Sequence, residues 1–420
     1  MVITEKMLKR AFSKLLSEFS FIKGNLLTLI VSWIFMDFTF SMTSLFESPY
    51  IRALGASPFV IGLMNSAGVA VLSLVRIFGA YIADKYGRKQ IIVTMTFGIA
   101  ISYLFYTFAP DWRFILLGML ISNLCLIYQP ALEAIHADSI PPEKRGLGYA
   151  ASNVIPNIPA IFAPAIAGYL VEYYGLVSGM RLVYFIVFLC MLTAAIIRFL
   201  FLKETLPKHE KIRFEELKGV FKESLIAIKE AWNSMSKSLK FLTVALLVSA
   251  FEEPMFRNFT SLYVFDVIKV NDIEWGIVNA IWIFTTLVFG LPLGKIVDKI
   301  GRKNSILVGY LIFTPSSILF IFCRNFPQLL LSYTMFALGG ALINPAYNAL
   351  QADMIPREKR GRVMGTIGTL NVLATIPASA LGGYLYEVNP AAPFVWAVIL
   401  GIVVSCIIVF GVREPGKKEI

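Results

Sequence analysis

Long apolar segments separated by short polar turns dominate the chain. Six of them lie between residues 25 and 202, a polar stretch follows at 203–240, and six more lie between 241 and 412. Each segment is about 20 residues long, the length that an α-helix needs to cross the hydrocarbon core of a bilayer. The pattern therefore predicts an all-α membrane protein with twelve transmembrane helices.

The boundaries of these segments divide the chain into two bundles with polar ends. The predicted spans are 25–46, 58–79, 90–109, 114–136, 147–171, 181–202, 241–264, 274–293, 304–323, 327–349, 362–386 and 391–411. We expect an amphipathic segment at 1–24, a six-helix bundle at 25–202, a linker at 203–240, a second six-helix bundle at 241–412 and a tail at 413–420. Apolar residues at helical spacing among charges of both signs favour a linker that lies on the membrane surface.

The composition and the placement of charge agree with this class. The chain is 57% hydrophobic and 15% charged, whereas soluble chains are about a quarter charged. The net charge of +11 could indicate nucleic acid binding, so the location of the charges has to decide. By predicted membrane side, 31 Lys and Arg residues share the side of both termini and five lie on the other. Because basic loops stay in the cytoplasm, we expect cytoplasmic termini and linker and no nucleic acid partner.

Few side chains of the chain could carry covalent or metal chemistry. All four cysteines fall inside apolar segments without paired spacing, so we expect free thiols. Only two histidines occur, and no cluster of Cys, His and carboxylates has metal-ligand spacing. No nucleophile–base pair or phosphate loop is visible. We therefore expect no enzyme activity, no metal and no bound cofactor.

The two predicted bundles are sequence repeats of one another. AYIADKYGRK at 80–89 corresponds to GKIVDKIGRK at 294–303, and PALEAIHADSIPPEKRG at 130–146 corresponds to PAYNALQADMIPREKRG at 345–361. The offset is 214 or 215 residues throughout. Because six spans return each half to the side on which it began, the halves have the same orientation and are related by an axis along the membrane normal.

These motifs resemble the major facilitator superfamily, in which the loop after the second helix carries G-x-x-x-D-x-x-G-R-[RK]. The stretch from Gly294 to Lys303 fits this signature fully, whereas the first copy has Ala80 at its opening position. The resemblance covers the whole chain and implies the twelve-helix fold and small-molecule transport. Its closest pattern is that of multidrug efflux pumps of the drug–proton antiporter type.

The resemblance also implies a cytoplasmic gate made from the repeated motifs. Asp84 would face the N-terminus of span 11, where unsatisfied N–H groups favour a carboxylate, and Asp298 would face span 5 in the same way. Arg88 would pair with Asp138, and Arg302 with Asp353. The remaining gate positions are Gly87 and Gly301, which suit tight reversals, and Gly294, which suits close helix packing. A solvated basic loop that only fixes topology is the alternative reading.

Charged residues in the middle of predicted spans are the candidates for coupling and substrate binding. A carboxylate there costs at least about 2.5 kcal/mol, so its presence needs a reason. Asp37 lies deep in span 1, and Glu252 and Glu253 lie at a matching depth in span 7. These acids could take up a proton inside the central cavity. Arg257 follows Glu253 by one helical turn and could pair with it or bind an anionic substrate.

Neutral polar and aromatic residues give weaker indications of the substrate. Asn123 and Asn344 could line the cavity, although helix–helix hydrogen bonding is an equal alternative. Span 4 has no internal Arg, which the drug–proton antiporters carry, and span 5 matches their glycine pattern only in part. Spans 1 and 7 are rich in aromatic residues, which suits hydrophobic or cationic guests beside acidic groups.

The sequence therefore predicts a secondary transporter of the plasma membrane that works by alternating access. We expect a monomer that uses the proton gradient to export amphipathic, drug-like compounds. Uptake of a sugar or an organic anion is the alternative within transport. A membrane receptor or sensor without transport is the alternative from another class.

Overall fold

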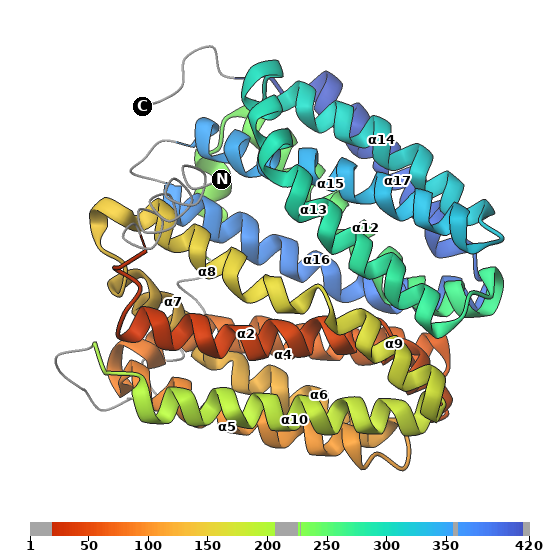
Figure 1. The fold of residues 1–420 in the computed structure, drawn as a ribbon. Coiled ribbons are helices and arrows are strands. Elements are labelled where there is room, and N and C mark those ends of the chain that lie inside the picture. Colours follow the sequence, from red (N-terminus) through yellow and green to blue (C-terminus); the bar gives the residue numbers. More distant parts are fainter. Residues whose placement is uncertain (1–18, 206–225, 227, 356–359, 415–420) are drawn as a thin grey trace, which may run out of the picture.

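The computed structural model describes residues 19–205, 226, 228–355 and 360–414, which are helical apart from short connections. Figure 1 shows the helices of the first half of the chain in one group and those of the second half in another, with the start of α2 and the end of α17 at the same end of the molecule. We call this end the terminal face, and the opposite end the distal face. The all-helical prediction is confirmed.

The first bundle begins at the terminal face and is interrupted in two of its spans. Span 4 contains a 3₁₀ turn just before Pro130, and span 5 breaks near Pro159, because proline removes a helical hydrogen bond. The helices are α2 (Asn25–Thr43), α3 (Glu47–Ala53), α4 (Pro58–Tyr86), α5 (Arg88–Thr107), α6 (Trp112–Cys125), η1 (Leu126–Tyr128), α7 (Gln129–Asp138), η2 (Pro142–Lys144), α8 (Arg145–Ala160), α9 (Ala163–Tyr174) and α10 (Leu176–Phe201).

The second bundle repeats this order with longer continuous helices. Its first helix ends in a π-helical turn that closes at Lys269 in the left-handed conformation. The helices are α12 (Lys237–Tyr263), η3 (Val264–Ile268), α13 (Asp272–Ile300), α14 (Arg302–Phe322), α15 (Phe326–Met354), α16 (Arg360–Val388) and α17 (Ala392–Gly411).

Eleven helical stretches among the described residues are long and apolar enough to cross a membrane. The twelfth predicted span is present as the long helix α12 but is not one of these eleven. Any segment of α12 long enough to cross contains Glu252 and Glu253 together with Lys240 or Arg257. The charged side chains that make α12 too polar to count as a membrane span therefore include the residues expected to act in coupling and substrate binding.

Polar caps define where the membrane helices begin. Ser57 accepts from the backbone N–H of Val60 at the start of α4, and Asn271 forms a capping box with Glu274 at the start of α13. Such caps satisfy N–H groups that have no partner within the helix. The two caps lie 214 positions apart, which is the offset of the sequence repeat.

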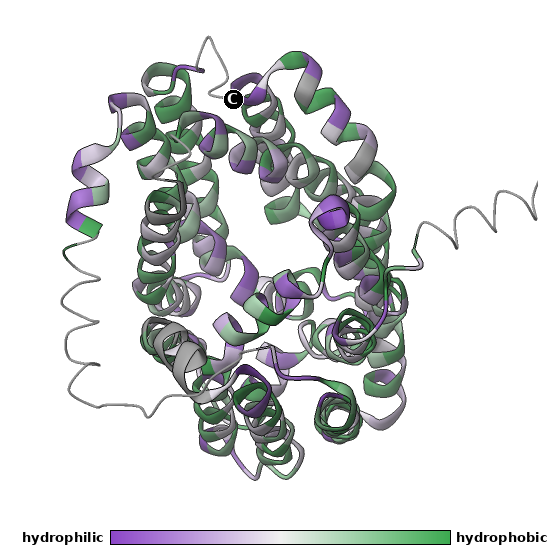
Figure 2. Cartoon of the chain, turned by 90° about the vertical axis from the view of Figure 1, so that its left-hand side faces the viewer, coloured by the Kyte–Doolittle hydropathy of each residue, from purple (hydrophilic) through white to green (hydrophobic). Residues whose placement is uncertain are grey.

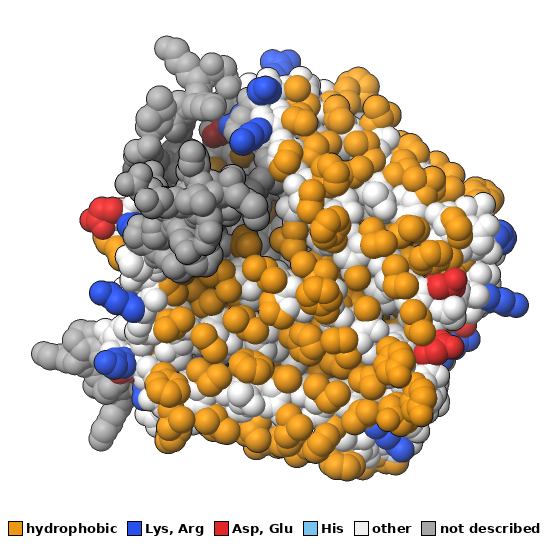
Figure 3. All heavy atoms as spheres, in the orientation of Figure 1, with side chains coloured by type: hydrophobic (Ala, Val, Ile, Leu, Met, Phe, Trp, Pro, Cys, Tyr) orange, Lys and Arg blue, Asp and Glu red, His pale blue; other side chains and the backbone are white. Residues whose placement is uncertain are grey.

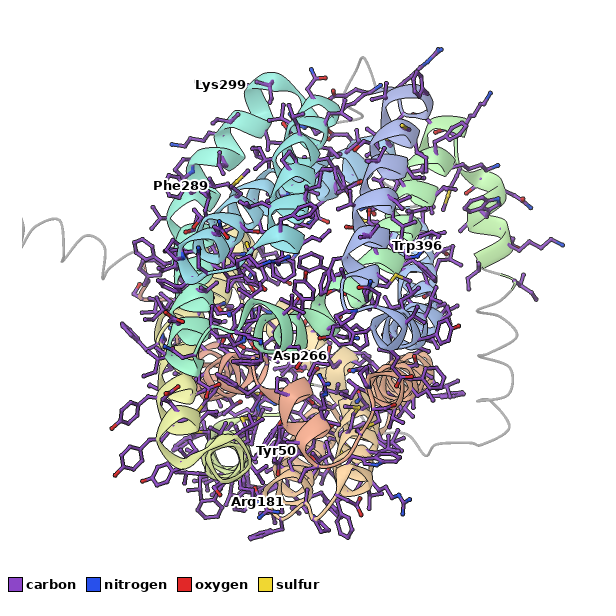
Figure 4. The ribbon with its side chains drawn as sticks, turned by 90° about the vertical axis from the view of Figure 1, so that its right-hand side faces the viewer. Tyr50, Arg181, Asp266, Phe289, Lys299 and Trp396 are labelled. Carbon is purple, nitrogen blue, oxygen red and sulfur yellow. The ribbon has the colours of Figure 1, made fainter. Side chains whose placement is uncertain are left out.

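The surface has the distribution of side chains that a bilayer requires. In Figure 3 hydrophobic side chains cover the broad middle of the visible face, while most of the Lys, Arg, Asp and Glu side chains lie toward the two ends. Exposed aromatic residues such as Phe289 and Trp396 belong to this apolar surface and lie at its outer edges in Figure 4. The chain is a multi-pass membrane protein.

Two predicted amphipathic segments are described only in part. Of the predicted N-terminal segment at 1–24, residues 1–18 lie outside the described residues, as do residues 206–225 of the linker. The end of the linker is helical, and its Ala231 and Met235 are buried against Leu239 and Leu242 of α12. This part of the linker therefore packs on the second bundle.

Candidate functional site

The two bundles meet at the distal face. Six hydrogen bonds join them within the part of the chain that the structure describes, and all involve residues in the distal halves of their helices. Figure 2 looks onto the terminal face, where no such bond joins the described residues of the two bundles and the ion pairs stay within one bundle. The six run from Ser48 Oγ to Asn258 O, Arg52 to Asp266, Phe59 N to Glu387 Oε1, Ser66 Oγ to Ile376 O, Asp272 N to Glu172 Oε2, and Trp275 Nε1 to Leu45 O.

An ion pair lies at the centre of this distal contact. Arg52 of α3 binds the Asp266 carboxylate, which also accepts a hydrogen bond from Tyr386 Oη at 2.8 Å. Asp266 belongs to the π-helical turn η3, which changes the direction of side chains relative to α12. Figure 4 looks onto this face and labels Asp266 of the second bundle and, below it, Tyr50 of the first bundle, two residues before Arg52.

At the terminal face the predicted ion pairs are present, and each stays within one bundle. Arg88 Nη1 lies 2.6 Å from Asp138 Oδ2, and Arg302 Nε lies 3.3 Å from Asp353 Oδ2. Both arginine side chains are mostly buried, at 16% and 11% exposed. These contacts fasten the loop after the second helix of each bundle to the end of its fourth helix.

The glycines of the motif have two different roles. Gly87 and Gly301 have φ angles of 102° and 90°, which only glycine adopts readily, so the predicted tight reversals are confirmed. Among the described residues no atom lies within 4 Å of the position of the missing Cβ of Gly294, so its close helix packing stays a prediction. In the first copy Gly79 is the tightly packed residue, since a Cβ there would lie 2.5 Å from Ile127 O. The side chains of Asp84 and Asp298 are outside the described part of the structure, so their contacts stay predictions.

The charged residues of α12 occupy two faces of the helix. Glu252 is 6% exposed, and no Lys or Arg pairs with it among the described residues. Glu253 forms the predicted ion pair with Arg257, and these side chains are 53% and 63% exposed. Arg257 lies close enough to Glu47 of the first bundle to favour its ionised form. The Glu253–Arg257 pair therefore faces the other bundle and not only lipid.

The other predicted residues of the cavity differ in exposure. Asp37 is partly buried in α2, with no described basic partner. Asn344 is exposed on α15. Asn123 donates to Met119 O of its own helix at 2.9 Å and packs against Gly68 of α4. Asn123 therefore contacts α4, while its printed hydrogen bond stays within its own helix, and its place in the cavity stays a prediction.

The structure adds Arg198, which the sequence had placed with the basic residues of the linker. Its side chain is fully buried near the terminal end of α10 and makes no ion pair with a described carboxylate. Its guanidinium lies 5.6 Å from the ring centroid of Tyr128, in the 3₁₀ turn of span 4. It donates to Ser32 Oγ at 3.0 Å, Thr96 Oγ1 at 2.9 Å, Tyr128 Oη at 3.5 Å and Met36 Sδ at 3.1 Å.

A second unpredicted residue is Glu47 of α3, which lies outside the candidate spans. Its side chain is partly buried beside the tyrosines of α5 and α10, and burial raises the pKa of its carboxyl group above the ordinary value of 4.5. The Arg257 guanidinium offsets part of this rise. The tyrosine rings pack against one another, with centroid distances of 5.5 Å for Tyr103 and Tyr106 and 4.7 Å for Tyr106 and Tyr184.

An open cavity of about 510 Å³ borders the terminal half of α13. It is lined by Val288, Pro292, Lys295, Ile296 and Lys299.

Fold, repeat and internal charge define a membrane carrier made of two repeated six-helix bundles. A family model described as Major Facilitator Superfamily matches residues 27–271 and 242–420. The chain belongs to this superfamily and is a secondary transporter, not an enzyme.

Relatives and solved structures agree with this assignment. The chain is 26% identical over 314 residues to the multi-drug resistance efflux pump PmrA of Streptococcus pneumoniae, covering 73% of this chain and 74% of the pump. It is 23% identical over 390 residues to an uncharacterized MFS-type transporter of Methanocaldococcus jannaschii, covering 86% and 88%. The structure of a bacterial homologue of the human lysosomal transporter Spinster, inward-facing and unoccupied, has a TM-score of 0.71 at 16% identity and covers 92% and 96%.

Proposed function

We propose that this transporter exports amphipathic, drug-like compounds across the plasma membrane in exchange for protons, by alternating access. The terminal face would be cytoplasmic, and the structure would represent the conformation open to the cytoplasm. The observation that carries the proposal is α12, where a buried carboxyl group, Glu252, adjoins the Glu253–Arg257 pair between the bundles.

Glu252 is the residue to which we assign the exchange of protons. An ionised carboxylate inside a membrane protein is costly without a cation, and no described Lys or Arg pairs with Glu252. Protonation removes this cost, and a change in access to water would release the proton. Asp37, its counterpart in the sequence repeat, would support the same exchange from the first bundle.

The Glu253–Arg257 pair would take part in substrate binding. Both side chains are more than half exposed although they lie in the middle of a long membrane helix. A cationic substrate could replace Arg257 at Glu253, whereas an anionic one could replace Glu253 at Arg257. The similarity to a multidrug efflux pump supports the first of these possibilities.

Transport by purified protein in proteoliposomes tests this proposal. With an imposed pH gradient and ethidium as a fluorescent lipophilic cation, we expect ethidium to move against its concentration gradient while protons move the opposite way. Absence of ethidium movement under every pH gradient would contradict drug–proton exchange.

The alternative of anion or sugar uptake makes a different prediction for two variants. If the substrate is an organic anion, Arg257→Ala should abolish its transport and Glu253→Gln should not. If the substrate is an amphipathic cation, Glu253→Gln should raise KM for ethidium by about tenfold, the loss expected for one charged contact.

A further inference from the structure

At the distal face, the side chains of two glutamates extend from one bundle to the other, and each contacts the N-terminus of a helix there. Glu387, at the end of α16, accepts a hydrogen bond from the backbone N–H of Phe59 in the first turn of α4, at 3.0 Å. Glu172, near the end of α9, accepts one from the N–H of Asp272 in the first turn of α13, at 3.3 Å. Each carboxylate thus belongs to one bundle and its donor to the other.

The internal repeat relates these two contacts. Glu172 and Glu387 lie 215 positions apart, and the helix starts that they reach are capped by Ser57 and Asn271, 214 positions apart. The same arrangement therefore occurs twice in opposite senses. The first bundle supplies the glutamate in one contact and the helix N-terminus in the other.

Glycines at both crossings bring the helices close enough for these contacts. A Cβ on Gly168 would lie 2.5 Å from Asp272 O, and one on Gly383 would lie 2.4 Å from Pro58 O. The same holds one turn further along the opposing helices. A Cβ on Gly276 would lie 2.8 Å from Pro164 O, and one on Gly62 would lie 2.4 Å from Ser379 O. The backbones approach closely at these points, which brings both exposed carboxylates within hydrogen-bond reach of the N–H groups.

Neither helix start needs the second carboxylate for its own stability. Ser57 already caps α4, and Asn271 with Glu274 forms a complete capping box on α13. The added interaction is electrostatic, because a helix N-terminus carries a partial positive charge that favours a carboxylate, and at α13 this attraction has to exceed the repulsion between the carboxylates of Glu172 and Asp272. Since its two parts belong to different bundles, this interaction exists only while the distal face is closed.

We propose that Glu172 and Glu387 are positioning residues that form a two-point latch holding the distal face closed. The latch rests on the alternating access of the proposed function and opposes the gate predicted for Asp84 and Asp298 at the terminal face. It acts beside the Arg52–Asp266 ion pair, which also joins the bundles at this face. The balance between the two ends sets the resting conformation.

Distances between spin labels on the two bundles test the latch. Phe108 and Phe322 are suitable label sites because they are 69% and 67% exposed at the distal ends of α5 and α14. The labels are introduced as Phe108→Cys and Phe322→Cys in a full-length protein with its four cysteines replaced. Pulsed electron paramagnetic resonance then gives the ratio of distal-open to distal-closed molecules, with and without ethidium.

The double variant Glu172→Gln with Glu387→Gln should raise this ratio by about tenfold, and each single variant by about threefold. Glu274→Gln is the matched control. It also removes one negative charge at the N-terminus of α13, but the Glu274 carboxylate accepts its hydrogen bond from Asn271 of the same bundle. This control should leave the ratio unchanged.

An unchanged ratio in the double variant would overturn the latch, and so would an equal rise in the control. These results would leave the proposed function intact if wild-type protein still moves ethidium under a pH gradient. A single distance in wild-type protein under every condition would refute alternating access itself and, with it, the latch.

Discussion

The two bundles share one fold and one repeated sequence, yet each buries a different charge. The first buries Arg198, and the position 215 residues later is Arg413, which is exposed beyond the end of α17. The second buries Glu252, whose counterpart Asp37 is only partly buried. The two halves therefore share the arrangement of their helices but not the charged side chains that they bury.

The surroundings of the two buried charges indicate different roles. The hydroxyl groups of Ser32 and Thr96 that accept from Arg198 themselves donate to carbonyl oxygens of their own helices, so this network is complete. Glu252 has no described basic partner and adjoins the Glu253–Arg257 pair that faces the other bundle. We interpret Arg198 as a structural tie and Glu252 as a group that changes its state during transport.

Glu252→Gln gives the largest expected effect on this comparison. The amide keeps the shape of the side chain but cannot exchange a proton, so pH-driven ethidium transport should fall at least about 1,000-fold. Counterflow of ethidium without a pH gradient should persist, because substrate still binds and the bundles still move. Loss of both activities in a folded variant would assign Glu252 to binding instead.

Arg198→Ala should affect folding more than coupling. Deleting a large, fully buried side chain leaves a cavity and removes the tie between α2, α5, η1 and α10, so the free energy of unfolding should fall by about 3 kcal/mol. Thermal unfolding of the purified protein measures this. The methionine of Arg198→Met fills more of the cavity than alanine does, so this variant should lose less unfolding free energy. If Arg198→Met instead keeps its Tm and loses pH-driven transport, the first bundle also takes part in coupling.

The terminal gate should respond less strongly. Asp84→Asn together with Asp298→Asn should raise the population open at the terminal face by about tenfold, because two carboxylates that favour helix N-termini are lost. Reactivity of single cysteines at the distal face toward a membrane-impermeant thiol reagent should fall accordingly. Unchanged reactivity would leave the motif with a topological role only.

Glu47→Gln should give the smallest effect, and its size depends on pH. Burial raises the pKa of Glu47 in the folded protein above 4.5, so the unfolded chain loses this proton first as the pH rises. The contribution of Glu47 to the free energy of unfolding is therefore fully present below pH 4.5. It is lost as the pH rises through the pKa of Glu47 in the folded protein. The Tm of Glu47→Gln relative to wild type should increase across that range. A constant difference would show that the carboxyl group is not perturbed.

Much of the scaffold could be predicted from the sequence because bilayer thickness fixes helix length. The span near residues 241–264 was recognised although it carries Glu252 and Glu253, since its apolar flanks and the repeat require a helix there. The ion pairs of Arg88 and Arg302 were implied by the resemblance of the repeated motif to the major facilitator superfamily.

The remaining site residues could not be predicted because they lie near helix ends. Hydropathy places Arg198 beside the basic linker, and only the packing of α2, α5 and α10 shows that its side chain turns inward. Glu47 follows the first span and resembles a loop residue until α3 forms. Glu172 and Glu387 resemble solvated helix ends, although their offset of 215 residues was a signal available in the sequence.

The central claim, that Glu252 carries the proton exchanged for substrate, can be tested by measuring proton release when ethidium binds to purified protein in a weakly buffered solution. We predict release of about one proton per bound ethidium in wild type and in Arg198→Met, and none in Glu252→Gln. Undiminished release from Glu252→Gln would contradict this account.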